Sequence, residues 1–412
     1  MQKIFLPLFL SCSIAAIMLS SACKSPGPKR VHNLSESDER KAITIVNQGL
    51  RDNSPELKLR ALTIASRQKE VDYGQSVRPL LTDSHEMVAS ASALYLHNST
   101  LHADGSADKL AEQYLQSSSE HVRAFMLAGI ARTRGSSSRA LVLSGLSDKS
   151  ARVRRVAVAA MGSWRQAEDW QRLVATAQSD SSPRVRSSAL RALLHHKQGD
   201  EGLIASALKD SYVGARLAGI ALLNKFGEDT SLQELRSLAM PGDFPTALSA
   251  AAALYQRNKA DMSELLSAAL QSPDWETRAS ALNAATRCAP RQYAIKMAIL
   301  ASADTNVQVS LTAARLLRRL GEDTRASATF QLVLRSETLA DRLSAAVDLA
   351  IIGDANAMQL LSQLSMSGST AQRIAAIDLQ RSSRVVSEGL LASLSDPELE
   401  IRLAAADALL SR

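Results

Sequence analysis

The sequence predicts an all-α protein, built as a right-handed α-solenoid of about twelve helix-turn-helix repeats. Hydrophobic residues make up 46% of the 412 residues but aromatic residues only 4%, so the core must consist mainly of alanine, leucine, isoleucine and valine. Alanine and leucine favour helices. Glycine and proline are sparse, at 18 and 11 residues, and no stretch shows the alternation of β-strands. The third observation is a polar frame that returns about every 31 residues.

Residues 1–22 have the three parts of a secretory signal peptide. Lys3 supplies the basic start, residues 4–19 form an apolar run, and residues 20–22 are small. The apolar run has 16 residues and contains Pro7, whereas a helix that spans a bilayer needs about 20. We therefore expect an exported protein rather than a transmembrane helix at this end.

The end of this segment resembles a bacterial lipobox, in which the cysteine after the small residues is acylated, for example with palmitate. That cysteine is Cys23. A lipobox usually has leucine three residues before the cysteine, but Ser20 stands there and Leu19 one step earlier, so ordinary cleavage before the cysteine is the alternative. Lys24 rather than aspartate follows, which in enteric-type bacteria implies an outer-membrane lipoprotein that faces the periplasm. Residues 23–34 contain proline, glycine and basic residues, and we expect a flexible tether there.

The rest of the chain, residues 35–412, repeats one frame: Asp or Ser, five residues, and Arg at the start of a helix rich in alanine and leucine. The frame begins at residues 54, 83, 117, 148, 180, 210, 241, 272, 304, 336, 367 and 396, with spacings of 29 to 34. At 83, 241 and 304 the residues Ala89, Ala247 and Ser310 replace the Arg, and the frame at 241 begins with Pro241 in place of Asp or Ser. We therefore expect one continuous array of about twelve units.

Each unit reads as helix, turn and helix, as the fourth unit illustrates. Residues 139–146 are expected to form helix A, residues 147–151 the turn and residues 152–161 helix B, with apolar residues at helical spacing on one face. The Asp or Ser of the turn is expected to cap helix B, because its side chain can accept from free N–H groups. Pro55 and Pro183 follow within the first helical turn, where a missing N–H costs little.

The turn Asp and the Val-Arg or Ile-Arg pair that opens helix B, as in Asp148 with Val153 and Arg154, resemble HEAT repeats. The resemblance is to the short bacterial, HEAT-like kind related to the repeats of phycobilin lyases, and it covers nearly all of residues 36–412. Together with the lipobox it implies a bacterial HEAT-repeat lipoprotein. The resemblance is informative about architecture and says little about function, because one fold hosts many functions.

Stacked repeats bury one continuous core and form a superhelix with a long concave surface. Twelve units with helices about 8–10 Å apart would give a contour of roughly 100–120 Å. The last unit is expected to be a capping repeat whose outer side is polar and faces solvent. The polar residues expected there are Asp396, Glu398, Glu400 and Asp407.

Common catalytic motifs are missing from the sequence: GxxxxGK[ST], GxGxxG, GxSxG, HExxH and an EF-hand loop do not occur. Adjacent residues on a helix point about 100° apart, so His195 and His196 are not expected to bind a metal. Cys288 is expected to be a small buried hydrophobe. We therefore expect no enzyme activity, no cofactor and no metal.

The Arg that ends the frame is expected to be structural, because it can bond turn carbonyls or carboxylates and so link neighbouring repeats. The expected ladder consists of Arg60, Arg123, Asp148, Arg154, Asp180, Arg186, Asp210, Arg216, Arg278, Arg342, Arg373, Asp396 and Arg402. Replacing one such Arg should destabilise the array locally before it weakens any binding.

Positive charge is concentrated in residues 121–200, which hold 14 basic and 5 acidic residues, whereas the whole chain holds 48 and 41. Arginines outside the ladder make this segment a candidate docking surface for an anionic partner. The candidate binding residues are Arg152, Arg155, Trp164, Arg165, Arg172 and Arg191. A solvated basic face without a partner is the alternative.

These observations favour a non-catalytic scaffold in the cell envelope that binds a protein partner through the solenoid surface. Binding of anionic envelope polymers or lipid head groups is the alternative. HEAT-like arrays also occur in phycobilin lyases and in alkyl-purine DNA glycosylases with a basic concave face. The export signal disfavours nucleic acid, however, and the sequence indicates no reacting centre and no small-molecule substrate.

Overall fold

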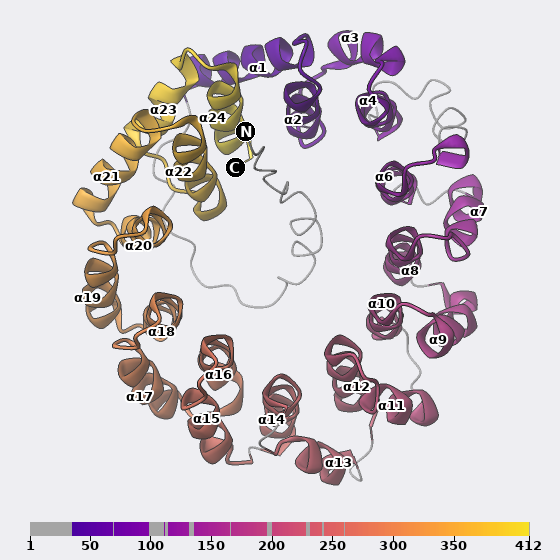
Figure 1. Ribbon diagram of the computed structural model, residues 1–412, viewed down its shortest axis with the longest axis vertical. Helices are drawn as coiled ribbons and strands as arrows, with labels where there is room; N and C mark the ends of the chain where they lie inside the picture. The colour runs from indigo at the N-terminus through magenta and orange to yellow at the C-terminus, as the bar shows by residue number, and fades with distance from the viewer. Residues whose placement is uncertain are drawn as a thin grey trace, which may run out of the picture. The chain divides into compact units, whose positions relative to one another are not determined.

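Helices in two layers make up the part of the chain that the structure describes (Figure 1). The structure is a computed structural model and describes residues 35–411 except 69, 99–110, 112–113, 132–135, 165, 196–199, 228–230, 241–242 and 259. The expected signal peptide, the acylated Cys23 and the tether lie outside these residues. Among the helices described, none has the length and apolar character to cross a bilayer.

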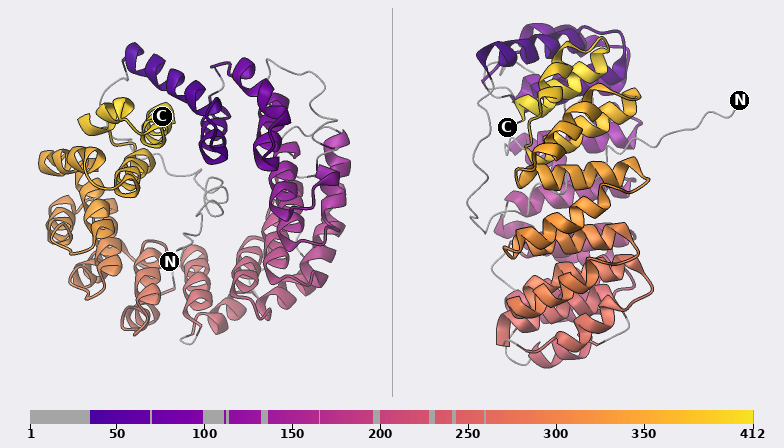
Figure 2. Two further views of the ribbon diagram at one scale, coloured as in Figure 1. Left: turned by 45° about the horizontal axis from the view of Figure 1, so that its top comes forward. Right: turned by 90° about the vertical axis from the view of Figure 1, so that its left-hand side faces the viewer.

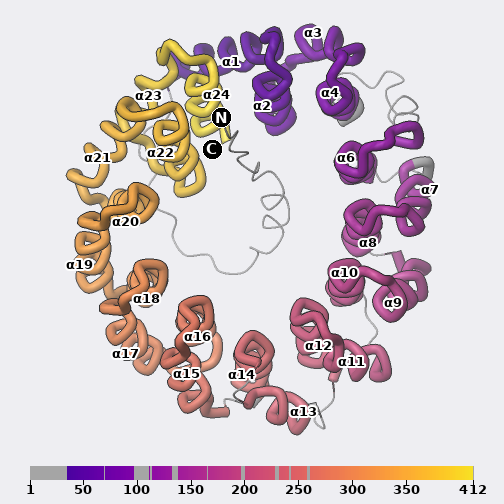
Figure 3. The backbone as a smooth tube through the Cα atoms, viewed as in Figure 1, coloured from indigo at the N-terminus to yellow at the C-terminus, as the bar shows by residue number. Residues whose placement is uncertain are grey.

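The outer layer contains the first helix of each repeat, and the inner layer contains the second (Figure 3). The outer helices are α1 (Glu36–Leu50), α3 (Gly74–Val77), α7 (Ser136–Gly145), α9 (Trp170–Ser179), α11 (Glu201–Leu208), α13 (Ser231–Leu238), α15 (Ser263–Leu270), α17 (Arg291–Ala301), α19 (Asp323–Val333), α21 (Ala355–Met366) and α23 (Glu388–Ala392). The inner helices are α2 (Pro55–Ala65), α4 (Glu86–Asn98), α6 (Glu120–Ile130), α8 (Ala151–Trp164), α10 (Pro183–Leu193), α12 (Val213–Phe226), α14 (Phe244–Asn258), α16 (Trp275–Cys288), α18 (Val307–Arg319), α20 (Leu339–Ile351), α22 (Thr370–Ser383) and α24 (Leu399–Leu410). Short 3-10 helices η1 (Arg78–Thr82), η2 (Ala167–Asp169) and η3 (Ser393–Ser395) adjoin α3, α9 and α23.

This arrangement confirms the predicted all-α solenoid of stacked helical pairs. In the fourth unit, α7 covers residues 136–145 where we expected 139–146, and α8 covers residues 151–164 where we expected 152–161. The helices therefore lie where the periodicity placed them, and only their ends differ.

Asp148 and Asp180 lie two residues before the helix cap and stabilise the turn, which corrects the capping expectation for these aspartates, whereas Ser54 caps α2 as expected. The Asp180 carboxylate accepts the backbone N–H of Ser182 at 2.8 Å, and it is Ser182 that stands at the N-cap of α10. Asp148 accepts the N–H of Ser150 at 2.8 Å in the same way. Aspartate often bonds to its own backbone two residues on, and this turn leaves part of the carboxylate free for a further partner.

Small side chains set the close spacing of the inner helices. Ala157, Ala189 and Ala215 are fully buried in three successive inner helices. Gly162 of α8 faces Ala192 of α10 so closely that an added Cβ would lie 2.7 Å from the Ala192 Cβ. The alanine-rich, aromatic-poor composition therefore suits a core made of closely packed helices rather than of large side chains.

The first and last repeats pack against each other, so the array of residues 36–410 closes on itself (Figures 1 and 2). One hydrophobic core contains residues of both ends, among them Ile45 and Leu50 of α1 with Ile401 and Leu403 of α24. We call this interface, formed by residues 36–68 and 370–410, the seam. It also contains polar contacts, since Gln68 Nε2 donates to the carbonyl oxygen of Leu410 at 2.7 Å.

Closure contradicts the expectation of a capping repeat with a wet outer side. Asp407 is only 7% exposed, and its carboxylate accepts from Arg67 at 2.8 Å across the seam. Leu403 and Ala405 of the same helix are fully buried. The last repeat has no free end face, because α1 covers the surface that a cap would expose.

Candidate binding surfaces

Most of the repeated arginines bridge consecutive turns, and Arg154 shows the geometry in full. Arg154 of α8 donates from Nε and Nη2 to both carboxylate oxygens of Asp180, at 2.8 and 2.9 Å, and from Nη1 to the carbonyl oxygen of Asp148 at 3.0 Å. Its guanidinium thus joins its own turn to the next one through a bidentate ion pair, which is a strong form of hydrogen bond. Carboxylate partners of the same kind join Arg123 to Asp148, Arg186 to Asp210, Arg216 to Asp243, Arg278 to Asp304 and Arg373 to Asp396.

The arginine bridges help to hold the pKa of Asp148, Asp180, Asp210, Asp243 and Asp304 below the ordinary value. For Asp210 and Asp304 the largest cause is the hydrogen bond from the arginine, and burial opposes it. For Asp148 and Asp180 burial is the largest single influence and raises the pKa, but the arginine and backbone hydrogen bonds together outweigh it. These five carboxylates are therefore ionised at neutral pH and form part of the structural ladder.

The first unit departs from the expected register by two residues. The Asp52 carboxylate accepts the backbone N–H of Ser54 at 2.8 Å, so the frame of this unit begins at residue 52 and not at 54. Lys58 therefore occupies the ladder position and pairs with Asp83 of the next turn at 2.7 Å. The assignment of Arg60 to the ladder is wrong, because Arg60 lies two residues beyond that position.

Arg60 instead belongs to a charge network at the seam. It lies 3.7 Å from Asp378 of α22, and Arg381 lies 3.7 Å from Asp378 and 3.4 Å from Asp407. Arg67 completes the network through its contact with Asp407. Burial raises the pKa of Asp378, and the nearby Asp407 carboxylate adds to the effect, while Arg60 and Arg381 lower it.

Two ladder arginines bond carbonyl groups without a carboxylate partner among the described residues. Arg342 Nη1 donates to the Ser336 carbonyl oxygen at 3.3 Å. Arg402 Nη1 donates to the carbonyl oxygens of Asp396 and Pro397 at 2.7 and 2.9 Å. The frame that follows Arg342 starts with a serine, so Arg342 has no turn aspartate to meet there.

The structure divides the candidate binding arginines between the two layers. Arg152 and Arg155 lie on the inner helix α8 and Arg191 on the inner helix α10, whereas Arg172 lies on the outer helix α9 and its side chain is 51% exposed. Arg152 Nε lies 3.6 Å from a carboxylate oxygen of Glu120. Arg155 and Arg191 form no ion pair with the described residues. These residues therefore do not share one face.

Trp164 is a core residue and does not belong to an exposed surface. It is 8% exposed, and its indole Nε1 donates to the carbonyl oxygen of Ala131 at 2.8 Å. Its place at the end of an amphipathic helix beside arginines made it look exposed in the sequence. Arg165, the next residue, lies outside the described residues.

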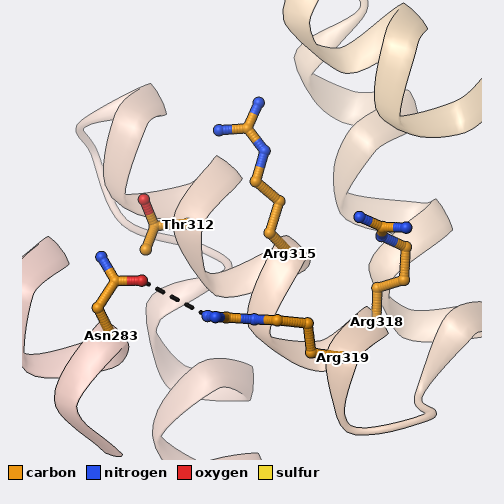
Figure 4. Close-up of a pocket in the computed structure, with 5 residues that line it drawn as sticks. All are labelled: Asn283, Thr312, Arg315, Arg318 and Arg319. Carbon is orange, nitrogen blue, oxygen red and sulfur yellow. Dashed lines mark hydrogen bonds between the residues drawn. The ribbon is translucent and has the colours of Figure 1, made fainter. Parts of the chain in front are cut away.

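A second basic cluster, which the sequence analysis missed, lies on the inner helix α18 (Figure 4). Arg315, Arg318 and Arg319 line a cavity of about 330 Å³ together with Thr312 and with Asn283 of α16. The spacing of three and four residues places all three arginines on adjoining faces of one helix. That spacing was visible in the sequence, but residues 301–412 hold 11 basic and 13 acidic residues, so charge averaged over the segment concealed it.

Within the described part of the chain, no group of His, Cys, Asp and Glu side chains could hold a metal ion. Cys288 is fully buried, with its Sγ 3.8 Å from the carbonyl oxygen of Leu248, and burial raises the pKa of its thiol to about 11. A buried neutral thiol is a packing residue and not an activated nucleophile.

The match to one protein family agrees with the helical repeats. Residues 107–194 match the family described as HEAT repeats, and these residues include α6 to α10. A solved structure from a study of tubulin recruitment and assembly by microtubule polymerases with Tumor Overexpressed Gene (TOG) domain arrays aligns with 81% of this chain and 99% of its own. The identity is 12% and the TM-score is 0.24. No curated protein sequence matches the chain.

Proposed function

We propose that this chain is a non-catalytic scaffold, anchored in the cell envelope, that binds a protein partner through the inner helices of units three to five. The observation that supports this proposal most directly is a contrast between two kinds of arginine on α8 and α10. Arg154 and Arg186 are held by carboxylates, whereas Arg155 and Arg191 have no ion pair among the described residues. Arginine with a free planar donor face is well suited to an acidic patch on a partner.

The family match supports the same reading. HEAT repeats generally act as protein-interaction scaffolds, and the matched residues 107–194 contain both free arginines. The closed array adds a rigid surface, because each inner helix is held on both sides by a neighbour. A preorganised surface loses little conformational entropy on binding.

Anchoring rests on the sequence of the first 23 residues. We place the chain in the outer membrane of a bacterial envelope, facing the periplasm, with acyl chains on Cys23. Metabolic labelling with an alkyne analogue of palmitate should mark the wild-type chain and leave the Cys23→Ser variant unmarked. An equal label on both would remove the anchor from the proposal.

The binding surface is tested by crosslinking and affinity capture from envelope membranes with the full chain as bait. The Arg155→Glu/Arg191→Glu variant reverses charge on the inner helices, and Arg172→Glu is its control on the outer helix α9. Circular dichroism checks that both variants fold. We expect a specific protein to be captured by the wild type and by Arg172→Glu but lost with the inner pair.

Two other results of the capture experiment would change the proposal. If both variants capture the same protein as the wild type, the partner docks on another surface of the scaffold. If no bait captures a protein, the scaffold proposal fails and anionic envelope polymers or lipid head groups take its place.

A further inference from the structure

The side chains of Arg315, Arg318 and Arg319 line the cavity beside α16 and α18 (Figure 4). Arg319 reaches toward α16, where its Nη2 lies 3.5 Å from Asn283 Oδ1. Arg315 and Arg318 extend from the same helix toward α20, whose Asp348 accepts from Arg315 Nε at 2.7 Å and lies 4.0 Å from Arg318 Nη2. Arginine side chains repel one another, so a cluster of this kind calls for a source of negative charge.

The described residues supply too little negative charge to balance the cluster. Asp348 is the one carboxylate there that forms an ion pair with any of the three arginines, and Arg319 has none. Burial raises the pKa of Asp348, so even this carboxylate is less readily ionised than usual. Three cations therefore face at most one anion.

Two further features show that the guanidinium groups are incompletely satisfied. Arg318 Nε is buried and has no hydrogen-bond partner. Burial, and then the charge of Arg318, lower the pKa of Arg319, which means that its charge is poorly compensated by its surroundings. A buried donor without a partner is costly, and a bound oxygen ligand would relieve that cost.

The dipole of α18 accounts for only part of this arrangement. Arg318 and Arg319 lie in its last turn, where cations interact favourably with the C-terminal end of the helix. That effect would hold equally well for side chains directed into solvent. It does not explain why the side chains of all three arginines line one cavity with Asn283 and Thr312, which add an amide and a hydroxyl to the lining.

We propose that this cavity is a binding site for a phosphate dianion, free or as a phosphomonoester. The planar donor forks of arginine match the oxygen geometry of phosphate and can bind it in pairs. A cavity of about 330 Å³ has room for a phosphate and several further atoms, because one water occupies about 30 Å³. The site lies outside residues 121–200 and does not depend on the proposed scaffold function.

The test is isothermal titration calorimetry of the full chain, kept in a non-ionic detergent, with inorganic phosphate at constant ionic strength. Arg319→Gln removes a cation that has no ion pair, so the fold should tolerate it. Arg335→Gln is the matched control, because it removes the same charge from an exposed position outside the cavity. Thr312→Glu is a second variant, which adds a negative charge to the cavity wall.

We expect saturable binding of one phosphate per chain in the wild type and in Arg335→Gln. Arg319→Gln and Thr312→Glu should each weaken the association constant about tenfold or more. Glycerol 3-phosphate and vesicles containing phosphatidic acid then separate the sources: binding of the soluble ester indicates a small metabolite, and binding of the vesicles alone indicates a lipid head group. Vesicles of phosphatidylcholine are the control for lipid without the exposed monoester.

Two outcomes would overturn the site. The first is the absence of saturable binding with all three phosphate probes. The second is an equal loss in Arg319→Gln and Arg335→Gln, which would show general attraction to a basic protein. Either result leaves the scaffold proposal untouched, since the pull-down variants lie on other helices.

Discussion

Replacing Leu403 with alanine tests whether the two ends of the array hold each other in place. Leu403 is fully buried in α24, and the hydrophobic core around it includes residues of α1. The backbone of α1 approaches closely at Gly49, where an added Cβ would lie 2.9 Å from either terminal methyl of Leu403. Truncating this side chain therefore opens a cavity in the seam.

The free-energy cost of this substitution depends on the complete burial of Leu403 and on how little the surrounding structure can relax into the cavity. Replacing a buried leucine with alanine costs about 2–5 kcal/mol, depending on how well the site can collapse. At the seam, collapse would require α1 to move as a whole, so we expect about 3 kcal/mol. Since 1.4 kcal/mol is a factor of about ten in an equilibrium, local opening should become about a hundredfold more frequent.

Hydrogen exchange followed by mass spectrometry measures that opening segment by segment. We expect faster exchange in α24 and also in α1 and α2, which are more than 300 residues away in the sequence. Leu282→Ala is the control, because Leu282 is equally buried in α16 but lies far from the seam in the chain. It should speed exchange in α16 and its neighbours and leave α1 unchanged. If Leu403→Ala speeds exchange in α24 but not in α1, the ends do not support each other and the closed array is refuted.

Three further predictions concern the ladder and the core. Asp180→Ala should lower the free energy of unfolding by about 1–3 kcal/mol in urea titration, because Arg154 loses its carboxylate, and an unchanged midpoint would argue against the ladder. The pKa values of Asp210 and Asp304 lie below the ordinary 3.8, so the stability that these groups contribute is complete above that pH and is lost as the pH falls through their lowered folded-state pKa values. Thermal unfolding should show a Tm that falls steeply below about pH 4, with a shallower fall in Asp210→Asn, and parallel curves would contradict the assignment. Cys288, whose thiol pKa is raised to about 11, should resist a disulfide reagent at about pH 8 until the protein is denatured, and peptide mapping that finds it modified in the native protein would disprove its burial.

The periodic frame suffices to predict the helical pairs, because most units have the same pattern of turn residue, ladder residue and apolar face. Closure could not be derived in the same way. It depends on small rotations between neighbouring repeats that add up over the whole array, and no single residue encodes them. One signal was present: α24 is apolar around most of its circumference, with Leu403, Ala405 and Leu409 among its residues. A helix of that kind is buried on all sides and does not suit an exposed end.

The arginine ladder could be predicted only in the units where the frame assigned from the sequence begins at the same residue as the turn in the structure. The aspartate and arginine of units four and five pair as their spacing suggests. In the first unit the similarity of Ser54 to the start of the last frame concealed the true pair of Lys58 and Asp83. The cavity on α18 was not predicted for another reason. It is lined by three arginines that lie close together, and the net charge of about a hundred residues does not reveal such a local cluster.

The seam has a consequence for how the molecule comes apart. A linear array of repeats is a one-dimensional chain in which a terminal unit can unfold by breaking a single interface. In a closed array every unit has two neighbours, so the first unit to unfold must break two interfaces, and fraying from the ends is suppressed. The number of repeats is constrained for the same reason. Duplicating or deleting one unit, which an open array tolerates, would here leave the first and last helices out of contact.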